Sequence, residues 1–186
     1  MRVITGSARG RRLKTLDSLE IRPTPDAVKE AIFSVIQFDV PAARVLDLFA
    51  GSGQLGIEAL SRGAAHCVFV DKNPDAVTVV RDNLAACKFP ASDVRVLNAD
   101  SVEFAKTSKG GFDIAFLDPP YRNGLLESVL PYLGDKMTEG GIVVCEHESE
   151  LTLPESFAGL TLRKRYRYGK VAVTVYNASE GSADDR

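Results

Sequence analysis

Runs of apolar residues alternate with segments of helical spacing through the centre of the chain. The runs that predict buried strands lie at residues 43–49, 66–71, 93–100, 112–118 and 140–148. Helical spacing lies between them at residues 53–63, 73–87, 101–108 and, in broken form, 124–133. This alternation predicts an α/β fold in which a parallel sheet is covered by helices on both faces.

Several of these elements carry signals at their ends. Asn73 before Pro74 predicts a helix start, and Gly63 predicts the end of the preceding helix. Ser101 is predicted to cap the short helix that follows it. Two strand-like runs on either side of Tyr168-Gly169 predict a closing hairpin. The aromatic residues predicted to lie in the core are Phe33, Phe38 and Tyr132.

The charges are distributed unevenly, although the net charge is only -2. Residues 1–24 carry six basic and two acidic side chains, and residues 161–170 carry five basic and none acidic. An acidic body with two basic ends favours a polyanionic partner, although two solvated basic faces would give the same pattern. Glycines at positions 6 and 10 predict a mobile or hairpin-like arm at the first basic end.

Length and composition are typical of one cytoplasmic domain with a small appendage. The chain has 186 residues, of which 45% are hydrophobic and 26% charged. No apolar run reaches the length of a membrane span, and the N-terminus lacks the apolar region of a secretory signal. The three cysteines have no CxxC spacing, which predicts reduced thiols, and with the two histidines they form no metal-ligand pattern.

A glycine-rich loop follows the first central strand. In "DLFAGSGQLG" the residues Gly51, Gly53 and Gly56 have GxGxxG spacing, and Asp71 ends the next strand. Such glycines permit a tight turn and a close approach of a ligand to the backbone, while the acid accepts hydrogen bonds from ribose hydroxyls. The pattern therefore predicts a cofactor that contains a ribose, although the glycines could serve a tight turn alone.

Asp47 narrows the choice of cofactor. It lies four residues before Gly51, where its carboxylate would repel the pyrophosphate of a dinucleotide. A cationic ligand such as S-adenosylmethionine fits better, and Asp100, with Ser101 beside it, is placed to accept from an adenine amino group. An NAD-linked oxidoreductase would explain the glycines and Asp71 but would leave Asp47 unexplained.

Acidic residues recur where the predicted strands end. Asp47, Asp71, Asp100 and Asp118 all fall at or near those ends, which meet on one rim of a parallel sheet where ligands bind. The last of the four begins the stretch Asp118-Pro119-Pro120-Tyr121. Two prolines usually mean a stiff exit from a strand, and beside three other acids they also suggest a backbone held rigid for chemistry.

These motifs together resemble the class I S-adenosylmethionine-dependent methyltransferases, and the D-P-P-Y form resembles their amino-methylating branch. The segments "RVITGSARGRRL", "IRPTPDAVKEAIFSVI", "DLFAGSGQLGIEALSRGA", "FVDKNPDAV" and the late "YGK" are similar to the RsmD family over nearly the whole chain. That family methylates the exocyclic N2 amine of a guanine in 16S ribosomal RNA.

The resemblance implies a Rossmann-like sheet of seven strands, the last antiparallel, with a small N-terminal β-hairpin arm. We therefore expect a basic arm at residues 1–24 and a methyltransferase domain at 25–178, and the polar composition of the last residues predicts a disordered tail at 179–186. The enzyme would be a monomer that acts on 16S rRNA in an assembling small subunit.

The resemblance also implies site residues. The Asp118 carboxylate and the Pro119 carbonyl would accept hydrogen bonds from the target amine, and Tyr121 would stack on a flipped base. The catalytic residues expected are Asp118, Pro119, Pro120 and Tyr121. Those expected at the cofactor are Asp47, Phe49, Gly51, Gly53, Asp71, Lys72, Asp100, Ser101 and Asp118. Those expected at the RNA are Arg2, Arg9, Arg11, Arg12, Lys14, Arg22 and Thr24.

Two further readings remain open at this point. Adenine-N6 methylation of DNA or RNA would use the same motif, since Tyr121 is also frequent in adenine methyltransferases. An RNA-binding module without activity could keep the fold, although the intact motif argues against it. The second basic end, with Arg163, Lys164 and Arg165, is a weaker RNA candidate, because edge strands also use charges to avoid edge pairing.

Overall fold

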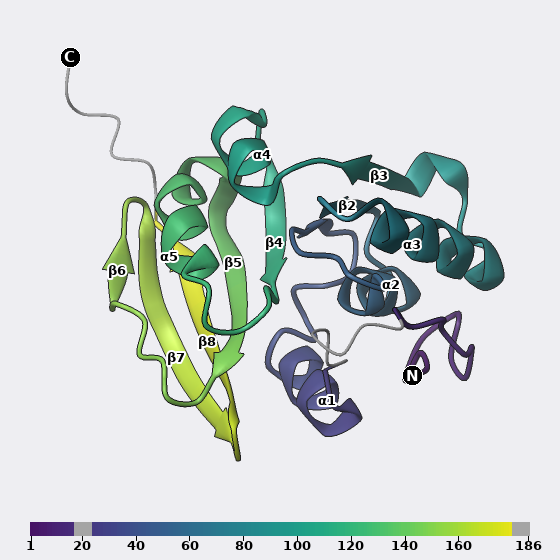
Figure 1. The fold of residues 1–186 in the computed structure, drawn as a ribbon, viewed down its shortest axis with the longest axis horizontal. Helices are drawn as coiled ribbons and strands as arrows, with labels where there is room; N and C mark the ends of the chain where they lie inside the picture. Colours follow the sequence, from purple (N-terminus) through teal and green to yellow (C-terminus); the bar gives the residue numbers. More distant parts are fainter. Residues whose placement is uncertain (17–23, 180–186) are drawn as a thin grey trace.

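Eight strands of the described chain pair into one mixed sheet, in the order β3-β2-β1-β4-β5-β8-β7-β6 (Figure 1). The computed structural model describes residues 1–16 and 24–179. The strands are β1 (Arg44–Asp47), β2 (His66–Asp71), β3 (Val94–Asn98), β4 (Phe112–Leu117), β5 (Met137–Glu148), β6 (Ser156–Phe157), β7 (Leu160–Tyr168) and β8 (Val171–Ala178). The α-helices are α1 (Asp26–Val35), α2 (Gln54–Ser61), α3 (Pro74–Cys87), α4 (Ser101–Thr107) and α5 (Leu125–Val129), and the short 3₁₀ turns are η1 (Ala91–Asp93), η2 (Leu130–Tyr132) and η3 (Gly134–Lys136).

The sheet confirms the predicted architecture, with one more strand than expected. Strands β3, β2, β1, β4 and β5 are parallel, and the last strand, β8, runs antiparallel to β5 and β7. The extra strand is β6, which pairs with β7 over two residues at the edge of the sheet. A strand of two residues is too short to show the alternation on which the sequence prediction depended.

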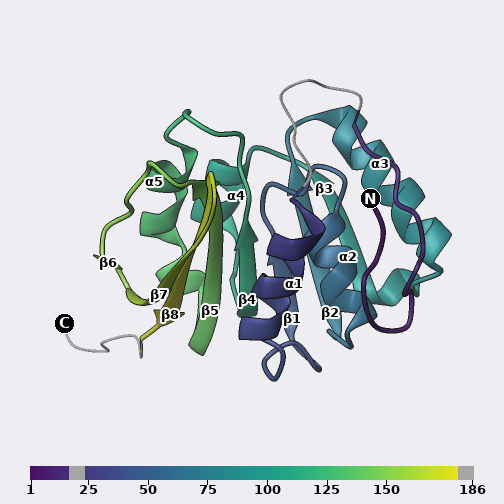
Figure 2. The same ribbon diagram turned by 90° about the horizontal axis from the view of Figure 1, so that it is seen from below.

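Both faces of the sheet are covered, as the continuous apolar strands predicted. Successive strand residues point to opposite faces, so Val45 packs with α1, α2 and α3, whereas Leu46 packs with α4 and α5. Figure 2 shows the two helical layers on either side of the strands. The strands are therefore held rigidly, and the ends of neighbouring strands keep fixed relative positions.

Two of the three predicted core aromatics lie at the surface. Phe33 is buried against Phe116, as predicted. Phe38 is 89% exposed, because α1 ends at Val35 and the turn that follows has left the helical period. Tyr132 is 40% exposed in η2, where its ring lies under the ammonium group of Lys106.

One predicted helix cap is also displaced by a residue. Ser101 is the first residue of α4, and Asp100 is its N-cap, because the Asp100 carboxylate accepts from the backbone N–H groups of Val102 and Glu103. A carboxylate is the stronger acceptor at this position and also faces the positive end of the helix. Asn73 caps α3 with Pro74 at its first position, as predicted.

The cysteines are free, with Cys67 and Cys145 buried and Cys87 partly buried, which agrees with the prediction of reduced thiols. Within residues 1–16 and 24–179, no helix has the length and apolarity to cross a bilayer. The same described residues contain no group of His, Cys, Asp or Glu suited to a metal ion.

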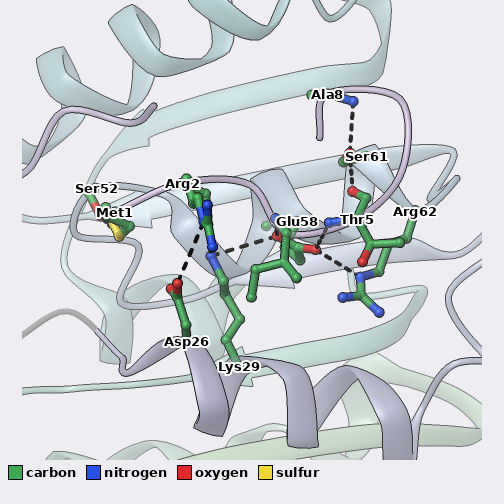
Figure 3. Close-up of polar contacts among 12 residues, drawn as sticks. Met1, Arg2, Thr5, Ala8, Asp26, Lys29, Ser52, Glu58, Ser61 and Arg62 are labelled. Carbon is green, nitrogen blue, oxygen red and sulfur yellow. Dashed lines mark hydrogen bonds and ion pairs between the residues drawn. The ribbon is translucent and has the colours of Figure 1, made fainter. Parts of the chain in front are cut away.

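The N-terminal arm, defined here as residues 1–14, folds back on itself and packs along α2. Figure 3 shows it running from Met1, beside Ser52 at one end of α2, to Ala8, beside Ser61 at the other. A single β-bridge joins Arg2 to Arg12, so the turn is a hairpin without regular strands. The side chains of Val3, Ala8 and Leu13 are buried in the core that α1, α2 and α3 share.

A buried glutamate on α2 fastens this arm to the domain. The carboxylate of Glu58 accepts from the backbone N–H groups of Ile4 and Thr5 at 2.9 and 3.0 Å and from Arg62 Nε at 2.9 Å. The Lys29 ammonium of α1 lies 3.6 Å from the same carboxylate, and neither side chain is exposed to solvent. The arm is therefore a fixed part of the domain surface between α1 and α2.

Candidate active site

Four acidic side chains lie on one face of the sheet where four neighbouring strands end. Asp71, Asp47, Asp118 and Glu146 occur at or just after the ends of β2, β1, β4 and β5, which are adjacent in that order. The registers pair Asp47 with Phe69 and Phe116, and Leu117 with Cys145, so the acids follow one another across the sheet. Of the four acids that the sequence placed on this rim, three belong to the row, and Glu146 extends it.

The glycine loop joins β1 to α2 at the centre of this rim. Gly51 has a φ of 55°, and a Cβ at this position would meet no atom within 4 Å, so the loop faces open space there. At Gly56 a glycine is required because the helix packs closely on the sheet: an added Cβ would lie 2.4 Å from the ring of Phe69 on β2. Gly53 lies between them and directly precedes α2.

Asp71 holds the shape of the glycine loop. Its carboxylate accepts from the backbone N–H of Gly51 at 2.8 Å and from that of Asn73 at 2.9 Å. The side chain remains partly exposed, and a carboxylate has further acceptor positions for ribose hydroxyls. The open space beside Gly51 and this half-satisfied acid fit the adenosine part of S-adenosylmethionine.

Asp47 lies beneath the loop and is 2% exposed. Its carboxylate accepts from the backbone N–H of Gly56 at 2.9 Å. Burial raises the pKa of Asp47 to about 7, the Gly56 hydrogen bond opposes this shift, and the charge of Asp71 adds to it. A cation bound above the loop would therefore favour ionisation of Asp47, which is consistent with a positively charged ligand.

The turn Asp118–Tyr121 follows β4, next to β1. Thr24, which is 3% exposed, places its hydroxyl group 3.1 Å from Asp118 Oδ2 and 2.7 Å from Glu146 Oε2. Burial and the neighbouring Glu146 raise the pKa of Asp118 well above its usual range. Pro119 is buried and Pro120 exposed, so the backbone turns outward within two residues of stiff chain.

Tyr121 is 41% exposed beyond the prolines. Its side chain hydrogen-bonds to Glu146, which lowers the pKa of that carboxyl group, although burial still raises the pKa of Glu146 to about 7. The aromatic ring is therefore held at the mouth of the site, where a planar group could stack on it.

The remaining predicted cofactor residues surround the glycine loop. Asp100 uses one carboxylate oxygen as the N-cap of α4. Ser101 is buried and donates its hydroxyl hydrogen to the Leu48 carbonyl, so this hydrogen is used within the protein. Phe49 is partly buried, and Lys72 is exposed directly after β2.

The predicted RNA residues divide into two groups. The basic residues of the arm are exposed along the side of the domain, where Arg2 lies 3.9 Å from Asp26 and Lys14 lies 2.7 Å from Asp82. Thr24 instead lies inside the site, and Arg22 is outside the described residues. The other exposed basic residues of the arm are Arg9, Arg11 and Arg12.

Sequence reasoning missed two residues, one in the row of acids and one between the arm and the glycine loop. Glu146 follows the apolar run "GGIVVC", so an acid at the end of the last parallel strand was the available signal. Asn83 of α3 gave no signal. Its side chain exchanges hydrogen bonds with the backbone of Lys14 and donates to the Ser52 carbonyl, which links the arm to the glycine loop.

Comparison with known proteins places the fold and the motifs in one family. The family model described as "Conserved hypothetical protein 95" matches residues 1–177. YlbH of Bacillus subtilis is 41% identical over 181 residues, which are 95% of this chain and 98% of that protein. "Ribosomal RNA small subunit methyltransferase D" of Escherichia coli is 36% identical over 99% of this chain and 93% of that protein. A solved structure from Escherichia coli, also 36% identical, superposes with a TM-score of 0.85 and covers 96% of this chain and 98% of its own.

Proposed function

The chain belongs to the RsmD family, and on this premise we propose that it transfers a methyl group from S-adenosylmethionine to the exocyclic N2 amine of a guanine in 16S ribosomal RNA. The observation that carries the proposal is the turn Asp118–Tyr121 at the end of β4, directly beside the strand that leads into the glycine loop. A target amine above Asp118 would lie next to a ligand held by that loop. A cytoplasmic location, as predicted from the sequence, accords with this proposal.

The cofactor would lie across the ends of β1 and β2. Gly51 leaves room for it, the Asp71 carboxylate accepts from its ribose, and Asp47 supplies negative potential beneath it. When bound, S-adenosylmethionine supplies a methyl group on a positively charged sulfur. The neighbouring residues proposed to contact it are Phe49, Gly53, Lys72, Asp100, Ser101 and Asp118.

The target base would be flipped out of the RNA and stacked on Tyr121. The lone pair of an exocyclic amine is delocalised into the ring, which makes the nitrogen a poor nucleophile. Hydrogen bonds from the amine to the Asp118 carboxylate and the Pro119 carbonyl would orient the lone pair toward the methyl group. Pro119 and Pro120 hold these acceptors in place before the base arrives, so that little ordering entropy is lost on binding.

The arm would contact RNA phosphates through Arg2, Arg9, Arg11, Arg12 and Lys14. Because the arm is fastened to α2 by Glu58, these side chains project from a fixed surface rather than from a flexible tail. Arg22, which lies outside the described residues, is proposed as a further RNA contact. RNA held on this surface should bind less tightly as the salt concentration rises.

The test is methylation of small ribosomal subunits from a strain that lacks this enzyme, followed by analysis of the nucleosides. We expect N2-methylguanine, and we expect Asp118→Ala to lower the rate about 100-fold or more, because the target amine loses its orienting acceptor. Glu139→Gln, at the far end of β5, is the matched control and should methylate normally. N6-methyladenine in place of N2-methylguanine would contradict the proposal, as would tight calorimetric binding of NAD without binding of S-adenosylmethionine.

A further inference from the structure

Asp118 does not act alone at the end of its strand. The register of β4 and β5 pairs Leu117 with Cys145, which places Asp118 beside Glu146. Glu146 is 4% exposed, and no described ion pair includes either acid. Two carboxyl groups so close together cannot both carry a full charge without a large repulsion in this setting.

The hydroxyl group of Thr24 joins the two acids. Its Oγ1 lies 3.1 Å from Asp118 Oδ2 and 2.7 Å from Glu146 Oε2. A hydroxyl group has one hydrogen to donate, so it cannot satisfy two ionised carboxylates at once. Both contacts are full hydrogen bonds only when one of the acids carries a proton and donates it to Thr24 Oγ1.

The groups that face the pair support a single shared proton. Asp47 of β1 adds negative potential on one side, and the Tyr121 hydroxyl group donates to Glu146 on the other. Burial and mutual repulsion raise the pKa of Asp118, and burial raises that of Glu146 to about 7. Near neutral pH the pair therefore holds one proton and one negative charge.

We propose that Glu146 is a positioning residue for methyl transfer, and that it shares one proton with Asp118 through Thr24, so that the pair can take up the proton released by the target amine. This inference rests on the proposed function. The amine nitrogen forms a bond to the methyl carbon, the carbon–sulfur bond breaks with its electron pair left on sulfur, and the nitrogen releases one proton. The proton joins the single negative charge of the pair, and both acids are then neutral until one returns it to solvent.

Glu146 has a definite task in this arrangement. Asp118 must be the ionised partner when it accepts from the amine, so the shared proton moves from Asp118 to Glu146 as the target base binds. As positive charge develops on the nitrogen, its proton can then enter the pair directly, without passing through solvent. A role limited to packing would give Glu146 no influence on the pH dependence of the reaction.

The first test measures the pair in the free protein, without RNA. Carboxyl carbons are labelled with ¹³C, assigned through bonds from the backbone, and titrated by NMR in wild type and in Glu146→Gln. We expect Glu146 to titrate near pH 7 in the wild type, and we expect Asp118 to titrate at least about one unit lower in Glu146→Gln than in the wild type, because the Glu146 charge beside it is removed. Titration of Glu146 near its usual value of about 4.3, or of Asp118 at the same pH in both proteins, would overturn the shared proton.

The second test is the pH profile of single-turnover methylation of the small subunit by wild type, Glu146→Gln and the control Glu139→Gln. Without the Glu146 charge, Asp118 ionises more easily, so the acid limb should move to lower pH by about one unit in Glu146→Gln alone. Rates and profiles equal to the wild type would overturn the positioning role. A wild-type protein that methylates no RNA would refute the proposed function, while the NMR titration would still decide whether the acids share a proton.

Discussion

Two glycines of one loop are glycine for different physical reasons. Gly51 adopts a left-handed backbone conformation beside open space, whereas Gly56 has ordinary backbone angles and lies against Phe69. The GxGxxG spacing predicts that both are small, but it does not say which one faces the ligand. The distinction matters because replacement by alanine should mainly affect stability at one position and cofactor affinity at the other.

We predict that Gly56→Ala mainly lowers stability and that Gly51→Ala mainly lowers cofactor affinity. At Gly56 the new methyl group would lie 2.4 Å from the Phe69 ring and 2.7 Å from Cys67 Sγ, which should cost about 1–3 kcal/mol of unfolding free energy. At Gly51 the strain of about 1–2 kcal/mol is accompanied by a methyl group in the space proposed for the ligand. Urea unfolding and calorimetry with S-adenosylmethionine separate the two effects, and equal profiles for the two variants would contradict the assignment.

At the scale of elements, the arm and α1 are joined through α2 by a buried ion pair. Glu58 serves the arm backbone, Lys29 and Arg62 together, and the pKa of Lys29 is lowered by burial while Glu58 opposes this shift. Such a group is costly to bury unless every charge has a partner. It stabilises the arrangement of three segments rather than any one helix.

We predict that Glu58→Gln lowers the free energy of unfolding by about 3–5 kcal/mol, because it leaves the Lys29 charge buried without its partner. Combining it with Lys29→Met should recover part of this loss, since the second change removes the stranded charge. Urea unfolding measures both variants. The control is Glu103→Gln in the exposed pair with Lys106, which should change stability by less than about 0.5 kcal/mol. Equal effects of Glu58→Gln and the control would refute the role of the pair.

At the scale of the whole molecule, the free protein carries a row of buried acids whose ionised forms are destabilised by burial and, for Asp47 and Asp118, by the charge of a neighbouring acid. Asp47, Asp118 and Glu146 all have raised pKa values in the folded state. An acid of this kind binds its proton more tightly when folded, so its favourable contribution is complete at low pH and is lost as pH rises through the folded pKa. These acids therefore lower the free energy of unfolding near neutral pH, and their negative electrostatic potential favours the binding of a cation.

We predict that Asp47→Asn stabilises the free protein more at pH 8 than at pH 5. The folded pKa of about 7 against the ordinary 3.8 corresponds to a difference on the order of 2–3 kcal/mol between these two pH values. The amide oxygen of the introduced asparagine side chain can still accept from Gly56, so the loop keeps its hydrogen bond. Unfolding at both pH values measures the effect. An exposed control, Asp135→Asn, should show no such dependence, and a pH-independent gain for Asp47→Asn would contradict the prediction.

The sequence alone determined the alternation of strands and helices, the closing hairpin at Tyr168-Gly169, the glycine loop and the turn at Asp118. Each of these is local, because hydrophobic period, helix caps and glycine spacing act over a few neighbouring residues. The positions of Phe38 and Tyr132 were wrong where helices ended earlier or became irregular, since a period carries no information beyond the end of its element.

Only the tertiary structure decided which residues from distant segments meet. The pairing of β4 with β5 brings Glu146 to Asp118, and Thr24, 94 residues before Asp118, joins them. The folding of the arm onto Glu58 likewise depends on contacts across more than 50 residues. Register and packing between separate elements determine such contacts, and a pattern along one chain does not encode them locally.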